Sequence, residues 1–178
     1  LLILFILILP VAGYYAFFFM LSFTALYFIY SAPHTRFKRI PFFSSFLIAL
    51  AVLTEVMAGF FLVSNSKTIS TFPTEAVFGV ILITFLWSHI RDIKDIEGDS
   101  KAGVDTVAVL WGTKVVGLTA SFSFLLIPIF TGLNILWLTT IPAGLATYYF
   151  CTKKPYREFP VFLTYFIFIL ISGIILFF

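Results

Sequence analysis

Long runs of apolar residues, separated by Pro, Gly and polar clusters, limit what this 178-residue chain can fold into. The mean hydropathy is +1.11, and only 11% of the residues are charged. An ordinary soluble domain has roughly a quarter charged residues. Inside a bilayer every backbone polar group must be satisfied within the protein, which favours helices. The sequence therefore predicts an all-α, polytopic transmembrane helix bundle.

Seven apolar segments are expected to form this bundle. Most are long enough to cross roughly 30 Å of hydrocarbon at about 1.5 Å per residue. The first is short, as expected of a helix whose beginning is missing, so we expect Leu1 to follow the N-terminal part of a longer protein. The segments are residues 1–9, 12–30, 42–63, 74–90, 114–130, 133–150 and 159–178.

The basic residues are distributed asymmetrically between these segments. If the segments alternate across the bilayer, ten of the eleven basic residues fall on one side, and only Lys67 falls on the other. The positive-inside rule places the ten in the cytoplasm. The acidic segment 89–103 lies on the same side. The sequence thus predicts a multi-pass integral membrane protein whose Asp-rich loop faces the cytoplasm.

Residues 89–103 hold four of the eight acidic residues, directly after an apolar segment. Asp92, Asp95 and Asp99 have the spacing i, i+3 and i+7, which places them on one face of a continuous helix. Carboxylate oxygens in this arrangement suit hard divalent cations that bridge to a phosphorylated substrate. The alternative is a charged, solvated loop between helices, which is where membrane proteins normally carry charge.

The loop between residues 30 and 41 is basic and is expected on the same side. It either anchors the topology or clamps a diphosphate, with Pro33 and Pro41 limiting its conformations. Arg offers bidentate contacts to phosphate, whereas Lys supplies a mobile charge. Basic side chains available for phosphate oxygens are Arg36, Lys38, Arg39, Lys94 and Lys101.

Three other features limit the chemistry. One Cys rules out an internal disulfide, and two distant His residues disfavour a zinc site. Glu55 is the only acidic residue deep in an expected span, where a charge is costly. We expect Glu55 to face the bundle interior, either as part of a cavity or in a structural polar contact.

Two elements resemble a known family. Residues 92–112 resemble the second aspartate-rich motif of the UbiA-type intramembrane prenyltransferases, which has the form DxxDxxGDxxxG followed by a Thr and a later Gly. Residues 30–38, with Tyr30, Arg36 and Lys38, are similar to the basic loop after that family's fourth helix. Two apolar segments separate the elements, as in the family.

The resemblance implies a nine-helix bundle around a cavity open to the membrane, of which about seven helices are present here. Residues 1–178 would be a single prenyltransferase domain that is incomplete at its N-terminus. The family's first aspartate-rich motif has no counterpart in this chain. The resemblance therefore also implies that this fragment alone is inactive.

The implied reaction transfers a prenyl group from a polyprenyl diphosphate to a lipophilic acceptor within the membrane, with Mg²⁺ as cofactor. Asp92, Asp95 and Asp99 would be the metal-binding and catalytic residues. The acceptor stays open between a quinone precursor, an ether lipid and a carotenoid. Membrane lipids are expected partners, and nucleic acids are not. The implied substrate-binding residues are Tyr30, Arg36, Lys38, Arg39, Lys94 and Lys101.

Two alternatives belong to other functional classes. The first is a transporter or ion-conducting bundle that uses the acidic segment as a cytoplasmic vestibule. It would be expected to carry broken or charged helices at mid-membrane, where only Glu55 qualifies. The second is a non-catalytic remnant of the enzyme family.

Overall fold

The computed structural model describes residues 2–31, 40, 42–64 and 68–177, with their side chains from Gly13 to Leu176. These residues form helices joined by turns, and the described part contains no strand, which confirms the all-α class. The 3₁₀-helices there are η2 (Ile69–Thr71), η3 (Ser88–Ile93) and η4 (Asn134–Leu136). The α-helices are α1 (Leu2–Ser31), α2 (Phe43–Val63), α3 (Thr74–Trp87), α4 (Ile96–Lys101), α5 (Val107–Thr131), α6 (Trp137–Thr152) and α7 (Glu158–Phe177).

Most of these helices are suited to a bilayer. Within the described residues, five helical segments are long and apolar enough to cross a membrane. α6 has 16 residues, about 24 Å of helix, and is slightly shorter than a full span. The spans are Gly13–Ser31, Phe43–Val63, Thr74–Ile93, Val107–Thr131 and Glu158–Leu176. The chain is thus a multi-pass integral membrane protein.

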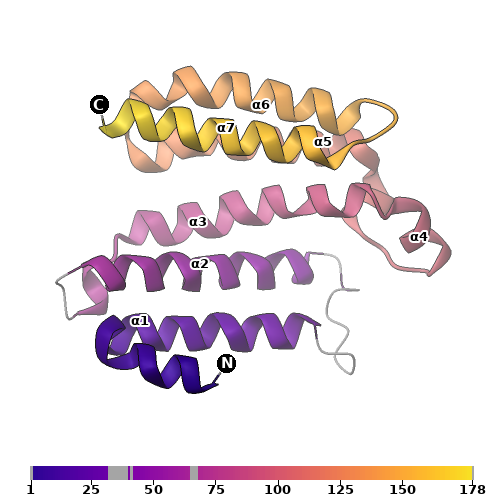
Figure 1. Ribbon diagram of the computed structural model, residues 1–178. Helices are drawn as coiled ribbons and strands as arrows, with labels where there is room; N and C mark the ends of the chain where they lie inside the picture. Colours follow the sequence, from indigo (N-terminus) through magenta and orange to yellow (C-terminus); the bar gives the residue numbers. More distant parts are fainter. Residues whose placement is uncertain (1, 32–39, 41, 65–67, 178) are drawn as a thin grey trace.

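The long helices pack mainly against their neighbours in sequence. α1, α2 and α3 lie side by side, and α3 also contacts α5, which packs against α6 and, through Phe124, against Phe168 of α7. Figure 1 shows that the end of α1, the start of α2, α4 and the α6–α7 turn all lie at one end of the bundle. The Asp-rich segment therefore shares this end with two other chain connections, α1–α2 and α6–α7.

Two glycines bend helices at positions where the sequence predicted separate segments. α1 runs through both of the first two predicted segments but is non-helical at Gly13 (φ 73°, ψ 166°). α5 begins at Val107, seven residues before the predicted start at 114, and is non-helical at Gly112 (φ 76°, ψ 174°). Glycine adopts positive φ without the steric cost of a Cβ. The two predicted boundaries are kinks within longer helices.

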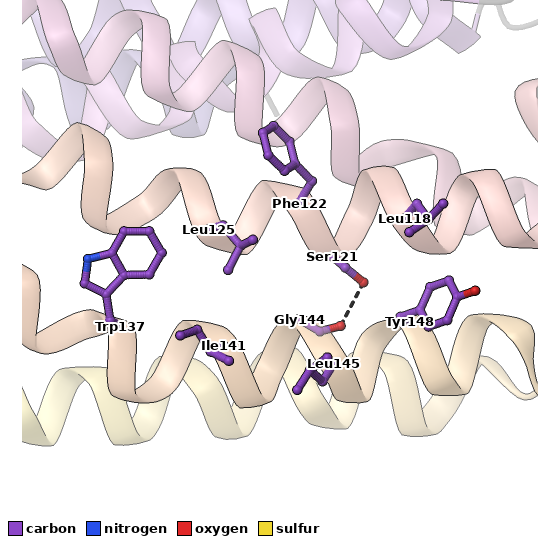
Figure 2. A pocket seen from close by; sticks show the side chains of 9 residues that line it. All are labelled: Leu118, Ser121, Phe122, Leu125, Trp137, Ile141, Gly144, Leu145 and Tyr148. Carbon is purple, nitrogen blue, oxygen red and sulfur yellow. Dashed lines mark hydrogen bonds between the residues drawn. The ribbon is translucent and has the colours of Figure 1, made fainter.

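Small residues bring α5 and α6 close together. The Ser121 hydroxyl donates hydrogen bonds to the carbonyl oxygens of Gly117 and Gly144, each at 2.7 Å. A Cβ at Gly144 would lie 3.1 Å from the Ser121 carbonyl oxygen, so the backbones approach closely there. Figure 2 shows this contact at the centre of the α5–α6 seam. Such close approach is typical of helix pairs in membranes.

The expected position of Glu55 inside the bundle is wrong. Its side chain is exposed, whereas Leu53 and Met57 on the same helix are buried against α1 and α3. Successive helical residues are about 100° apart, so Glu55 points about 200° away from Leu53. The neighbouring core positions therefore turn the carboxylate toward the outer surface of α2.

Candidate functional site

The Asp-rich segment begins where α3 ends. α3 continues into η3, a turn follows at Lys94 and Asp95, and α4 begins at Ile96. The predicted continuous helix is therefore wrong. Asp95 has φ −102° and ψ 4°, which lies outside the helical region and interrupts the helix before α4. The three carboxylates lie on two short helical pieces and the turn between them.

The three aspartates nevertheless act on one another electrostatically. Asp92 is partly buried in η3. The charges of Arg91, Asp99 and Asp95 all act on its carboxylate. Asp99 is partly buried in α4, whereas Asp95 is exposed in the turn. Repulsion among nearby carboxylates is relieved by a bound cation. The segment therefore combines clustered carboxylates with three interleaved basic residues, Arg91, Lys94 and Lys101.

Contacts around the buried His89 hold the start of this segment in place. His89 in η3 is 3% exposed, and its Nδ1 is hydrogen-bonded to the Ser45 hydroxyl of α2 at 3.1 Å. Edge-to-face ring contacts join His89 to Phe42 and Phe85, with centroid distances of 6.2 and 5.5 Å. Phe42 also contacts Trp111 of α5, at 5.3 Å. These contacts tie together the start of α2, η3 and the start of α5.

The end of the segment is fixed by turns and a helix cap. Gly103 has φ 64°, and the Val104 amide donates to the Asp99 carbonyl oxygen at 2.9 Å. The buried Thr106 then caps α5, because its hydroxyl accepts a hydrogen bond from the Val109 amide at 3.3 Å. The acidic residues therefore sit on a short loop that is anchored at both ends.

Tyr30 lies beside this segment, as the sequence predicted for a shared site. Nη2 of Arg91 donates to the Tyr30 hydroxyl at 3.5 Å, and the guanidinium carbon lies 5.9 Å from the ring centroid. The end of α1 is thus next to η3. Arg91 directly precedes Asp92 and was not among the predicted substrate-binding residues.

The predicted basic side chains have different surroundings. Nζ of Lys94 forms an ion pair with Glu158 at the start of α7, at 3.2 Å. Lys101 is exposed at the end of α4. Arg36, Lys38 and Arg39 lie outside the described residues. Sequence reasoning missed Glu158 as a partner because it lies 64 positions from Lys94 and belongs to another apolar segment.

The aspartates fit Mg²⁺ in chemistry but not as a complete cage. Among the described residues, no three His, Cys, Asp or Glu side chains form a group that could hold a metal ion. Mg²⁺ prefers oxygen ligands and is usually held by one or two carboxylates, waters and substrate phosphates. In the described part of the chain, Asp92, Asp95 and Asp99 thus do not come together as the three-carboxylate metal site that the sequence predicted.

Comparison with known proteins identifies the family. Residues 1–158 match the pattern of the UbiA prenyltransferase family, and the match ends where α7 begins. The chain belongs to this family. It is also similar to the lycopene elongase/hydratase of Haloarcula japonica, with 36% identity over 109 residues, which cover 61% of this chain. The chain spans 34%, about a third, of that UbiA-type relative. No solved structure matches.

Proposed function

We propose that the protein transfers a prenyl group from a polyprenyl diphosphate to a lipophilic acceptor inside the membrane. Membership of the UbiA prenyltransferase family supports prenyl transfer in general. The observation that carries the proposal is the position of the Asp-rich segment, next to Tyr30 and Arg91 at one end of an apolar helix bundle. The nearness of charged side chains to apolar helices supports the proposal, because a polyprenyl diphosphate has one charged and one apolar part.

Among the acceptors, a carotenoid-type polyene is favoured. The similar protein from Haloarcula japonica is named a lycopene elongase/hydratase. The loop that begins at Tyr30 resembles that of carotenoid-elongating members, whereas the run from Ile96 to Asp99 is similar to ether-lipid and homogentisate-type members, so the relative decides between the two resemblances. A linear hydrocarbon acceptor also needs few polar contacts, and the described helices are largely apolar. Quinone-precursor and ether-lipid acceptors are the competing outcomes.

In this proposal the chain's own residues hold and neutralise the diphosphate. Asp92, Asp95 and Asp99 would hold Mg²⁺, which when bound stabilises negative charge on the diphosphate oxygens. Arg91, next to Asp92, and the exposed Lys101 supply cationic donors for phosphate oxygens left uncovered. Lys94 joins them only when it leaves Glu158. Arg36, Lys38 and Arg39 remain proposed partners from the adjoining loop.

The preorganised charges lower the barrier to leaving-group departure, which is electrostatic catalysis. The C–O bond to the diphosphate breaks, the allylic carbon bonds to a carbon of the acceptor, and the adduct loses a proton; exclusion of water protects the reactive centre. Of the ten basic residues counted on one side, those described at the Asp-rich end include Arg91, Lys94 and Lys101, and the α6–α7 turn at the same end adds Lys153, Lys154 and Arg157. The positive-inside rule therefore supports a cytoplasmic location for the site.

The test is Mg²⁺-dependent diphosphate release by the full-length protein in lipid. Asp95→Asn and Asp99→Asn are each expected to lower the rate at least about 100-fold, because each removes a charge from the electrostatic site. Asp105→Asn is the matched control, since Asp105 is exposed and lies outside the trio. Unchanged turnover in both site variants would contradict the proposal. Cation flux into vesicles without diphosphate release would instead support the transporter alternative.

A further inference from the structure

Two cavities lie along the seam between α6 and α7. The first has a volume of about 290 Å³ and lies at the α6–α7 turn. The second has a volume of about 340 Å³, is lined largely by apolar side chains and reaches Leu138 and Ile171. The residues lining the first are Phe150, Lys153, Pro155, Arg157 and Pro160.

The two cavities follow one another along the same helix faces. Phe150 lies one turn after Ala146 on α6, and these residues line the first and the second cavity respectively. On α7, Pro160 lines the first cavity, and Thr164, one turn later, lines the second. Residues four positions apart share a helix face. The seam is therefore a groove that begins at the turn and continues along apolar surface.

The mouth of this groove is positively charged. Lys153, Lys154 and Arg157 are exposed, and Lys153 Nζ lies 5.4 Å from the centroid of the Tyr149 ring. The nearest carboxylate in sequence, Glu158, pairs with Lys94 at 3.2 Å. The Glu158 carboxylate thus pairs with a lysine of the Asp-rich segment, and the mouth of the groove keeps a positive charge.

We infer that the α6–α7 seam binds an anionic phospholipid. Lys153 and Arg157 contact the headgroup phosphate, for which Arg and Lys side chains are suited donors. One acyl chain follows the groove from Ala146 toward Leu138, a distance of about 12 Å along α6. The charge at the mouth and the apolar groove beneath it match the two parts of one lipid. This site is separate from the proposed prenyl-transfer site and does not depend on it.

The headgroup contact is tested by native mass spectrometry of the protein in detergent with phosphatidylglycerol or phosphatidylcholine of equal chain length. Lys153→Gln and Arg157→Gln are each expected to weaken phosphatidylglycerol binding about five-fold and phosphatidylcholine binding by a smaller factor, because the choline cation offsets the phosphate charge. Lys114→Gln, an exposed lysine on α5, is the matched control. Equal losses in all three variants would overturn the site in favour of a general charge effect.

The groove is tested with a bulky substitution. Ala146→Phe fills the second cavity and is expected to weaken binding of both lipids at least about five-fold, because burial of acyl methylenes is lost. Leu145→Phe is the control, since Leu145 lines a different groove, between α5 and α6 (Figure 2). Unchanged lipid binding by Ala146→Phe, or full displacement of the lipid by excess soluble glycerol phosphate, would show that no lipid occupies the seam.

Discussion

At the scale of single residues, the site depends on partners from distant parts of the chain. Arg91 meets Tyr30 from the end of α1, and His89 meets Ser45 from α2. Neither pair follows from local periodicity, because each partner lies more than 40 positions away. The sequence indicated that Tyr30 and the aspartates belong together, but only the fold shows which side chain connects them.

Removal of the His89 ring should destabilise the fold. His89→Ala breaks a buried hydrogen bond and leaves the Ser45 hydroxyl without its partner, so we expect a loss of about 1–3 kcal/mol. Thermal unfolding in detergent, followed by tryptophan fluorescence, measures the loss. Ser45→Ala and the double variant complete a thermodynamic cycle. A double-variant loss equal to the sum of the two single losses would show that the bond contributes nothing.

The Tyr30 ring should matter more than its hydroxyl. If the proposed function holds, Tyr30→Ala raises KM for the donor about five-fold, because Arg91 loses a cation–π partner and moves away from Asp92. Tyr30→Phe keeps the ring and loses only a long hydrogen bond of 3.5 Å, so its KM should change less than about two-fold. Equal effects of the two substitutions on KM would instead assign the role to the hydroxyl.

At the scale of helices, Gly13 and Gly112 bend α1 and α5 near positions where the sequence predicted a segment boundary. Gly112 has φ 76°, although a Cβ there would meet no atom within 4 Å. We therefore expect Gly112→Ala to lower the free energy of unfolding by about 1–2 kcal/mol through backbone strain alone. Gly98→Ala is the matched control, because Gly98 also has open space and lacks a positive φ. Chemical unfolding in mixed micelles measures the change in the free energy of unfolding for both variants. Equal changes in Gly112→Ala and Gly98→Ala would refute the strain argument.

Hydrophobic runs predicted the helices well and the polar connections poorly. Apolar length was enough to place α2, α3 and α7. It did not predict η3 and α4, because the i, i+3, i+7 spacing of Asp92, Asp95 and Asp99 does not distinguish one α-helix from a 3₁₀-helix followed by a turn. The early start of α5 was also missed, because Gly112 reads as a break although the helix continues across it.

At the scale of the whole molecule, one ion pair joins the Asp-rich segment to the last helix. The Lys94–Glu158 pair is half exposed, so its contribution to stability is expected to stay below about 1 kcal/mol. The three carboxylates and Tyr30 were named as site residues from the sequence, but this connection was not predicted. It depends on α7 beginning at the end of the bundle that carries α4 (Figure 1).

Loss of the Glu158 carboxylate should strengthen binding of the diphosphate donor, if the proposed function holds. Glu158→Gln frees Lys94, and donor affinity should rise about two- to five-fold at low salt, the range expected for a partly exposed ion pair. The gain should fall as ionic strength screens the charges. Lys94→Met is the control and should weaken binding. Titration with a non-hydrolysable donor analogue measures both, and a salt-independent change would contradict this account.

The pairing of Lys94 with Glu158 has a mechanical consequence. Glu158 is the first residue of α7. A phosphorylated substrate that binds Lys94 must first break the ion pair between Lys94 and Glu158. Binding of the phosphate by Lys94 and loss of the Lys94–Glu158 ion pair would then occur together. If the proposed function holds, binding of an anion by Lys94 is therefore expected to release Glu158, 64 positions further along the chain.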